Sequence, residues 1–385
     1  MSDAPVRGFP TSEFERRTDK AQRLMAEQGL DGLLLMSEPE VRYFSGFHTL
    51  FWQSPTRPWF LFVPAQGKPI ALIPEIGAEL MRQTWLDDIR TWAAPNPSDD
   101  GVSLLLDLLR PMAEQGATLG VMKGHETGLR MPLGDYERLV EGLPGVQVQD
   151  CTPLIRSLRM VKSGAEIEKI AHICGIASRS FARVPEIAFQ GQPLAETFRA
   201  FRCEILAQGA DDVPYLVGGA DQGGYRDVIS PPSTRPLQDG DVLMMDTGAT
   251  FDGYFCDFDR NWSIGPADPA SARAHETLWD ATEAGLNAAR PGATCRDLFA
   301  AMMSVIGDAD GDVGRLGHGL GMQLTEWPSH AAWDDTVLEE NMVLTLEPSL
   351  GYGDGKIMVH EENIVITDGA PRLLTTRAPR ELPVI

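Results

Sequence analysis

The stretch Val242–Asp259, VLMMDTGATFDGYFCDFD, determines how the second half of the chain folds. Two short runs of mainly apolar residues each end in an acidic residue, Asp246 and Asp257, which are 11 positions apart. Between them Asp252-Gly253 has the turn chemistry of a β-hairpin, which would bring the two carboxylates together. Neighbouring carboxylates in an apolar setting repel each other and are costly to bury, unless protons or cations neutralise them.

The same pattern recurs towards the C-terminus. The apolar run from Val343 ends in Glu347, and Glu361 follows another short strand pattern that begins at Lys356. His318 lies among glycines, which permit close backbone approach. Each residue alone is more often a turn, surface or core residue, but four carboxylates and one imidazole together suit two divalent ions such as Mn, Fe, Co or Zn. The candidate metal ligands are Asp246, Asp257, His318, Glu347 and Glu361.

The chain is long enough for two domains, with 385 residues. Residues 1–150 alternate helix and strand patterns, which predicts an α/β domain with a mixed sheet, and residues 151–165 carry the change to a second domain. Helices mixed with antiparallel strands then predict an α+β fold. We place the domains at residues 1–155 and 160–385.

Periodicity and turn residues predict the individual elements. Ser12 and Glu15 have the spacing of a capping box, and Gly29 should end the first helix. Further helices are expected at 104–109, 165–183, 194–208, 270–289 and 295–306. Strands are expected at 30–36, 58–64, 69–74, 118–122, 215–219, 242–246, 253–257, 343–347 and 362–367.

Composition excludes several kinds of partner and location. The formal net charge of −22 argues against nucleic acid and anionic lipid as partners. No apolar run approaches the roughly 20 residues of a membrane helix, and the N-terminus has no secretory pattern. Five widely spaced cysteines without a CxxC motif favour a cytoplasmic protein with reduced thiols.

The order and spacing of the five candidate ligands resemble the pita-bread metallopeptidase superfamily, which includes prolidase, aminopeptidase P, methionine aminopeptidase and creatinase. The spacings of 11, 29 and 14 residues fit its prolidase-like branch. The resemblance extends to VRYFSGF in the N-terminal half and to the linker, so it covers most of the chain. The matching stretches are MMDTGATFDGYFCDFDRNW, GHGLG, TLEP, HEENIVIT, VRYFSGF and RMVKSGAEIEKI.

The resemblance implies a creatinase-like, ribonuclease-H-like α/β N-terminal domain and a pseudo-symmetric pita-bread C-terminal domain. It also implies a homodimer in which the partner's N-terminal domain would reach the active site. It also implies that Asp257 and Glu361 bridge two metal ions. Asp246 would then bind one ion, and His318 with Glu347 the other. A metal-bridging hydroxide would hydrolyse a C–N bond of an amide or Xaa-Pro peptide, with Glu347 as the proton shuttle.

Three positions depart from the family pattern. Thr325 stands where family peptidases carry a second histidine, Ile229 where they carry another, and Val359 where an arginine is common. Thr325 can donate one hydrogen bond but cannot act as a cation or as a general acid near pH 7. Loss of both imidazoles should weaken ordinary peptide cleavage unless other groups replace them. Possible replacements are His330, Glu326, Asp259 and His360, of which His330 is the candidate catalytic residue beside Glu347 and Thr325.

Asp259 and His360 each have a distinct expectation. Asp259 stands two residues from Asp257, so on a strand the two would share a face and Asp259 could be an extra ligand or acid/base. Pairing of Asp259 with Arg260 or another surface cation is the favoured expectation. His360 adjoins Glu361 but should point to the opposite face.

Aromatic residues supply candidates for substrate binding. The segment 48–59 is rich in aromatics and contains one cation, so Trp52 and Arg57 could form a substrate lid across a dimer interface, or simply pack. Trp327, near Trp333, could line the pocket or pack in the same way.

Three functions therefore stay open. The first is a metal-dependent amide or peptide hydrolase. The second is an enzyme on the same scaffold that acts on a small non-peptide substrate, as creatinase, ectoine hydrolase and one dimethylsulfoniopropionate lyase do, and the missing histidines favour it. The third is a non-catalytic binding protein, which would have no reason to keep mutually repelling carboxylates together.

Overall fold

The structure is a computed structural model that describes residues 4–54, 57–307 and 314–385. It divides into two compact units, Val6–Arg159 and Met160–Ile385. None of the helices in the described part of the chain combines the length and apolarity that crossing a membrane requires.

The N-terminal unit contains the predicted mixed sheet, with strand order β4-β3-β2-β1-β5-β6. The central strand β1 pairs antiparallel with β2 and parallel with β5. Its strands are β1 (Gly32–Leu35), β2 (Phe60–Pro64), β3 (Ile70–Pro74), β4 (Ile89–Trp92), β5 (Thr118–Val121) and β6 (Gln147–Asp150).

Helices in this unit pack on the sheet through apolar side chains. Leu105 and Leu109 of α4 join Leu34, Phe60 and Leu72 of the strands in one buried cluster. The helices are α1 (Thr11–Gln28), α2 (Glu38–Ser45), α3 (Ala78–Met81), α4 (Val102–Gln115), α5 (Leu133–Glu141) and α6 (Thr152–Met160), with 3₁₀ turns η1 (Leu50–Gln53) and η2 (Glu75–Gly77).

The second unit is built from antiparallel sheets flanked by helices. One sheet has the order β10-β8-β7 with β9 on β8, a second has the order β12-β11-β13-β16-β17, and β14 pairs with β15. The strands are β7 (Asp212–Gln222), β8 (Asp241–Phe251), β9 (Tyr254–Phe255), β10 (Phe258–Ser263), β11 (His318–Gly319), β12 (Glu326–Ser329), β13 (Val343–Leu346), β14 (Ser349–Tyr352), β15 (Lys356–Val359), β16 (Glu362–Val365) and β17 (Arg372–Leu373).

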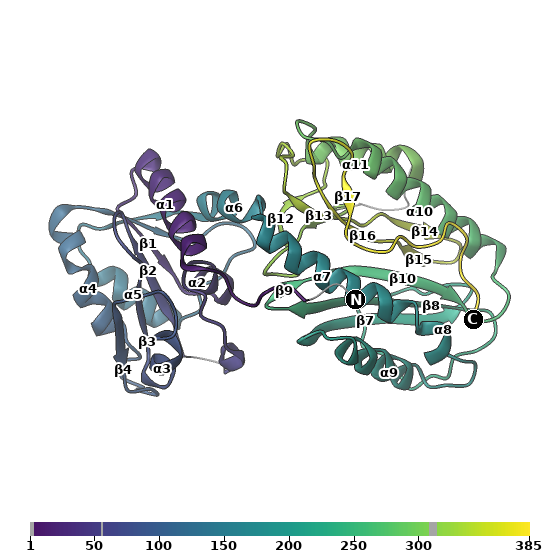
Figure 1. The fold of residues 1–385 in the computed structure, drawn as a ribbon, viewed down its shortest axis with the longest axis horizontal. Helices are drawn as coiled ribbons and strands as arrows, with labels where there is room; N and C mark the ends of the chain where they lie inside the picture. Colours follow the sequence, from purple (N-terminus) through teal and green to yellow (C-terminus); the bar gives the residue numbers. More distant parts are fainter. Residues whose placement is uncertain (1–3, 55–56, 308–313) are drawn as a thin grey trace. The chain divides into compact units, whose positions relative to one another are not determined.

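Two sets of helices cover these sheets, which is the arrangement expected of a pita-bread domain. Figure 1 shows α10 and α11 together at one side of the strands and α9 at the other. The α7 and α9 helices contact β8 and β7 respectively, while α10 contacts α11, β13, β14 and β15. The helices are α7 (Gly164–Phe181), α8 (Val184–Ile187), α9 (Leu194–Ala207), α10 (Pro269–Ala288) and α11 (Cys295–Ile306).

The predicted hairpin is confirmed, but its first strand is longer than expected. β8 continues past Asp246 to Phe251 and turns at Asp252. β9 and β10 then pair back along it, with Phe255 opposite Thr250 and Asp259 opposite Asp246. Asp246 therefore lies in the middle of a strand, because the small residues after it continue the ladder instead of ending it.

The capping box predicted at Ser12 is wrong. Helix α1 begins at Thr11 after Pro10, with no side-chain cap. A capping box with the same three-residue spacing does form at the start of α7, between Ser163 and Glu166. There the Glu166 carboxylate accepts from the Ser163 backbone N–H at 2.8 Å.

The capped start of α7 and the uncapped start of α1 should respond differently to loss of their serines. Ser163→Ala should lower the free energy of unfolding by about 1 kcal/mol, because the α7 backbone loses a cap. Ser12→Ala, in an exposed first turn, should change it by less than about 0.5 kcal/mol. Chemical denaturation of the two variants beside the wild type measures the difference, and equal effects would contradict the cap assignment.

Candidate metal centre

The five candidate ligands come from both sheets of the C-terminal unit. Asp246 lies within β8, and Asp257 lies between β9 and β10. His318 begins β11, Glu347 directly follows β13, and Glu361 directly precedes β16. Five side chains from strands that are far apart in the sequence thus lie in the same C-terminal unit.

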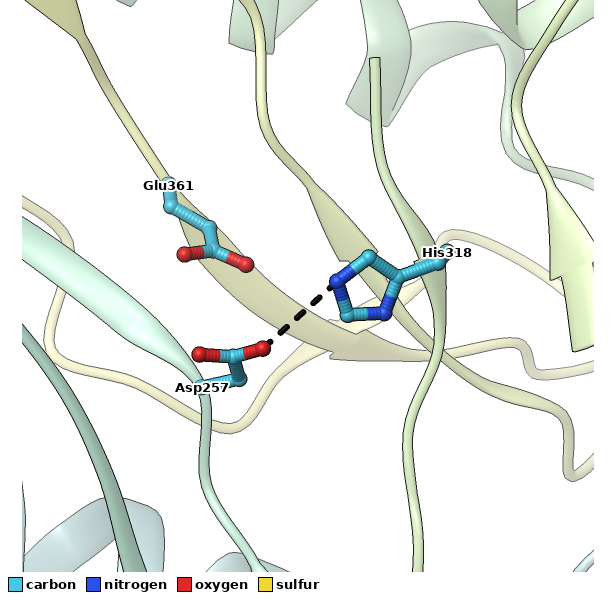
Figure 2. A group of neighbouring side chains, drawn as sticks. All are labelled: Asp257, His318 and Glu361. Carbon is cyan, nitrogen blue, oxygen red and sulfur yellow. Dashed lines mark ion pairs between the residues drawn. The ribbon is translucent and has the colours of Figure 1, made fainter. Parts of the chain in front are cut away.

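Three of these side chains converge closely. Asp257, His318 and Glu361 each offer a ligand atom, and these atoms lie within 4.8 Å of one another. Figure 2 shows the two carboxylates and the imidazole pointing towards a common space. The Nε2 atom of His318 is 3.5 Å from Oδ2 of Asp257 and 3.8 Å from Oε2 of Glu347. Glu347 thus adjoins the group, with its side chain 34% exposed.

The backbone fixes the orientation of the imidazole. Nδ1 of His318 is 2.9 Å from the carbonyl oxygen of Gly319. Because a carbonyl can only accept, Nδ1 carries the proton and Nε2 presents its lone pair to the carboxylates. Burial lowers the pKa of His318 to about 4, so the ring is neutral at pH 7 and suited to bind a cation.

Burial and mutual repulsion disfavour the charged forms of the carboxylates. Burial, with the charge of Glu347, raises the pKa of Asp246 to about 7. Burial likewise raises the pKa of Glu347 to about 7. Burial followed by the neighbouring carboxylates raises the pKa of Asp257 and of Glu361 well above their usual range. Divalent cations would reverse this repulsion, since each supplies two positive charges among the carboxylates.

Unpaired oxygen atoms show that the residues fit metal ions. Oδ1 of Asp246 and Oε1 of Glu361 are buried and have no hydrogen-bond partner among the described protein atoms. Leaving such atoms unpaired is costly, and hard divalent cations prefer oxygen ligands. The donor set therefore fits Mn, Fe, Co or Zn.

Side chains of neighbouring strands hold the ligand backbone in place. The Asn363 amide oxygen accepts from the Asp257 backbone N–H at 3.0 Å, and its amide nitrogen donates to the Asp257 carbonyl oxygen. The Arg260 guanidinium donates to the Glu361 carbonyl oxygen at 2.9 Å and to the Glu362 carboxylate at 2.9 Å. These contacts fasten the Asp257 hairpin to the strand that follows Glu361.

Tyr215 is a neighbour that the sequence did not reveal. It lies in β7 beside the Asp246 carboxyl group, whose pKa it lowers. Burial, with the charges of Asp246 and Asp257, raises the pKa of its phenol. The phenol therefore stays protonated next to Asp246. The only sequence signal was its place in the strand before the hairpin.

The three departures from the family pattern lie in different settings. Thr325 is half-buried just before β12, whereas Ile229 is 72% exposed. Val359 is buried at the end of β15, where its N–H donates to the Tyr225 hydroxyl at 3.0 Å. Thr325, Ile229 and Val359 therefore supply neither an imidazole nor a guanidinium to the centre.

His330 directly follows β12 and is fully buried. Neither ring nitrogen has a hydrogen-bond partner within the described chain, and burial lowers its pKa to about 3. Its backbone pairs with Gly317 and Leu316, next to His318. His330 is therefore a neutral ring beside the strand that carries the histidine ligand.

Two other proposed replacements have structural partners. Glu326 is buried and pairs with Lys162 at 3.0 Å, while it accepts from the Met322 backbone N–H at 2.8 Å. His360 turns towards helix α10, where Nδ1 lies 3.0 Å from the Thr282 hydroxyl. Its predicted orientation away from Glu361 agrees with this contact.

The candidates for substrate binding pack against their own surroundings. Trp327 is half-buried, stacks near Trp333 with ring centroids 5.8 Å apart, and donates to the Thr336 hydroxyl at 3.2 Å. In the N-terminal unit, Trp52 is buried and Arg57 lies 5.4 Å from the Phe51 ring. Pro55 and Thr56 of the proposed lid lie outside the described residues.

Convergent buried carboxylates and an imidazole, held by this two-sheet fold, define a metal-dependent hydrolase. Residues 168–368 match the model of metallopeptidase family M24, and residues 17–161 match the creatinase/prolidase N-terminal domain. The chain belongs to metallopeptidase family M24, in the prolidase-like part of the pita-bread superfamily. Membership implies a divalent metal cofactor.

Individual relatives are similar along almost their whole length. A probable dipeptidase PepE of Mycobacterium tuberculosis is 28% identical over 387 residues, covering 98% of each chain. The crystal structure of dipeptidase PepE from Mycobacterium ulcerans superposes with a TM-score of 0.84 at 29% identity, over 98% of this chain and 99% of that one. A prolidase from Thermococcus sibiricus gives a TM-score of 0.85 at 24% identity, over 97% and 99% of the two chains, and at that identity shows the fold alone.

Proposed function

We propose that this chain is a dinuclear-metal-dependent hydrolase that cleaves a C–N bond in short peptides, with Xaa-Pro dipeptides as the first substrates to test. The observation that carries the proposal is the convergence of Asp257, His318 and Glu361 in a buried setting. The names of the relatives, a probable dipeptidase PepE and the dipeptidase PepE of known structure, support a peptide bond as the target.

The proposed ligand assignment follows the family arrangement. Asp257 and Glu361 would lie between two cations, Asp246 would hold one of them, and His318 with Glu347 would hold the other. The unpaired Oδ1 of Asp246 and Oε1 of Glu361 support these roles, because each has an oxygen free to bind.

The protein side chains would orient the reaction and move protons. The two cations, when bound, supply Lewis acidity that lowers the pKa of water and polarises a carbonyl. Glu347 would hold the transferred proton, since it adjoins the ligands and its side chain is partly exposed. Thr325 would donate a single hydrogen bond to the substrate. His330, neutral and buried, would orient this part of the site.

A second candidate is a small non-peptide substrate on the same scaffold. Thr325, Ile229 and Val359 favour it, because they replace two imidazoles and a guanidinium that would stabilise a tetrahedral oxyanion. Trp327, Trp52 and Arg57 stay the candidate substrate-binding residues under either function. A non-catalytic binding protein is the least favoured, since four neighbouring, mutually repelling carboxylates serve no purpose without cations.

A substrate panel separates these functions. Protein loaded with Mn, Co or Zn should hydrolyse Xaa-Pro dipeptides faster than other dipeptides, small amides or betaine-like compounds, because the relatives are named as dipeptidases. Release of free amine measures the rates, with chelated protein as the control. Turnover of a small amide or betaine without any dipeptide would favour the second candidate, and no turnover at full metal loading the third.

Some further properties belong to the same proposal. We expect a homodimer located in the cytoplasm, with manganese as the first metal to test, and neither nucleic acid nor membrane as a partner. All five cysteines are unpaired in the structure, which supports a reducing compartment. We propose the domain limits 1–155 and 160–385 for separate expression of the parts.

A further inference from the structure

Asp259 lies on the metal-facing side of the hairpin. It is directly opposite Asp246 in the β8–β10 ladder, so the two side chains share one face. Asp257 lies two positions earlier, between β9 and β10. Asp259 is only 2% exposed. A third aspartate thus stands beside the first two, away from solvent.

The expected surface pairing of Asp259 with Arg260 is wrong. Arg260 is itself buried, and its guanidinium pairs with the Glu362 carboxylate at 2.9 Å. It reaches Asp259 only through the backbone carbonyl oxygen, at 2.6 Å. Successive strand residues point to opposite faces, which explains why the Arg260 guanidinium does not pair with the Asp259 carboxylate.

One oxygen of Asp259 is held and the other is open. Oδ2 accepts from the Asn261 amide at 2.7 Å, and the same amide nitrogen is fixed by the Val359 carbonyl oxygen at 2.8 Å. Oδ1 is buried without any hydrogen-bond partner among the described atoms. Asn261 therefore holds the carboxylate in a set orientation, with an unsatisfied oxygen on the face of Asp246. Such an oxygen requires a proton, a water or a cation.

We propose that Asp259 is a sixth protein residue of the metal centre, whose Oδ1 serves the same divalent cation as Asp246. The inference rests on the proposed function, because that function supplies the cation. It adds a fifth carboxylate to the centre, so the acidic charge exceeds that of two divalent cations by one. A donor set this rich in carboxylate oxygen favours a hard ion with a high coordination number, such as Mn²⁺, over Zn²⁺.

The test is metal binding by the Asp259→Asn protein, which keeps the side-chain size and an oxygen for Asn261. Calorimetric titration of chelated full-length protein should give an Mn²⁺ affinity about 10–100-fold weaker than wild type, the range for residues that support a metal site. The affinity for Zn²⁺ should fall less. The melting temperature of the metal-free variant should not decrease, because the substitution removes a carboxyl group whose charged form is costly to bury.

Asp241→Asn is the matched control on the same pair of strands. Asp241 is fully buried like Asp259, but both of its oxygens are paired: Oδ1 accepts from the Arg235 guanidinium at 2.8 Å, and Oδ2 accepts from the Gln238 N–H at 2.8 Å. Its neutralisation should lower the melting temperature and leave Mn²⁺ affinity unchanged.

The outcomes separate this inference from the proposed function. Wild-type Mn²⁺ affinity in Asp259→Asn would overturn the inference alone and make Asp259 a structural carboxylic acid. Failure of the wild type to bind any metal would overturn the proposed function and the inference together. If Asp259→Asn does not fold, Asp259→Ala is measured by the same criterion.

Discussion

Asp257→Ala is expected to remove at least one metal ion per chain and to abolish turnover. Asp257 lies 3.5 Å from the His318 imidazole and within ligand distance of Glu361, so it would contact both proposed cations. Replacement of a residue that merely supports a ligand lowers metal affinity by about 10–100-fold, and loss of a shared ligand should exceed that. Elemental analysis of the purified protein and hydrolysis of the best panel substrate measure the two effects.

Stability distinguishes loss of metal from loss of fold. The metal-free Asp257→Ala protein should melt no lower than metal-free wild type, because alanine removes a carboxyl group that burial and its acidic neighbours disfavour. Asp239→Ala, at an exposed carboxylate before β8, should keep both metal and activity. Full metal content in Asp257→Ala would show that the ligand assignment is incorrect.

Much of this centre follows from the sequence because an acidic residue beside an apolar strand is energetically exceptional. Asp257 and Glu361 each border a buried strand, and each has a position fixed by a nearby ladder. His318 could be picked out because glycines surround it: a Cβ at Gly317 would lie 2.3 Å from the Thr345 carbonyl oxygen. An acidic residue beside an apolar run and a histidine among glycines are local patterns, so they can be recognised from the sequence alone.

The supporting contacts could not be predicted in the same way. Asn363 clamps the Asp257 backbone from 106 positions away, and Tyr215 reaches Asp246 from the neighbouring strand. Neither has a distinctive sequence context, because an amide or phenol in a strand is common and only the register decides what it meets. Asp259 was considered from its spacing, but the adjacent Arg260 suggested a surface pair that burial excludes.

Element boundaries show the same limit. Asp246 was expected to end its strand, whereas β8 continues for five further residues because its partner β9 pairs back along it. The α1 capping signal at Ser12 was a coincidence of spacing, since Pro10 already sets the start of the helix. Spacing alone does not say where the backbone leaves the helical region.

The second large effect is an opposite response of metal-free and metal-loaded protein to pH. Between about pH 7.5 and 8.5 the melting temperature of chelated protein should fall, and the increase produced by saturating Mn²⁺ should grow. At a metal concentration about 1000 times the dissociation constant, the stabilisation is about 4 kcal/mol, or roughly 10 °C for a domain of this size. Thermal unfolding at several pH values, with chelator or with Mn²⁺, measures both trends.

The sign follows from the raised pKa values of the carboxylates. In the folded metal-free protein the pKa of Asp246 and of Glu347 is about 7, whereas their ordinary values are 3.8 and 4.5. The folded state therefore binds more protons than the unfolded chain, and the stability so gained is lost as pH rises through 7. Metal ions need the deprotonated forms, so their affinity rises over the same interval.

The choice of window matters because buried histidines act in the opposite direction below about pH 7.5. Their pKa values are lowered by burial, so the stability they contribute is present above 6.5 and is lost as pH falls. These histidines are His275, His318, His330 and His360. In the unfolded chain histidines stay partly protonated up to about pH 7.5. Above that pH they are neutral in both states, which leaves the carboxylates to set the slope.

A double variant assigns the slope to the metal centre. Asp246→Asn with Glu347→Gln removes both groups that titrate near pH 7, so the chelated variant should melt at a less pH-dependent temperature and gain little from Mn²⁺. A melting temperature of chelated wild type that does not fall from about pH 7.5 to 8.5 would mean that these carboxylates are already charged without metal. The repulsion on which the metal centre rests would then be absent, because some other cation, Arg315 being the one that faces Glu347, would be neutralising them.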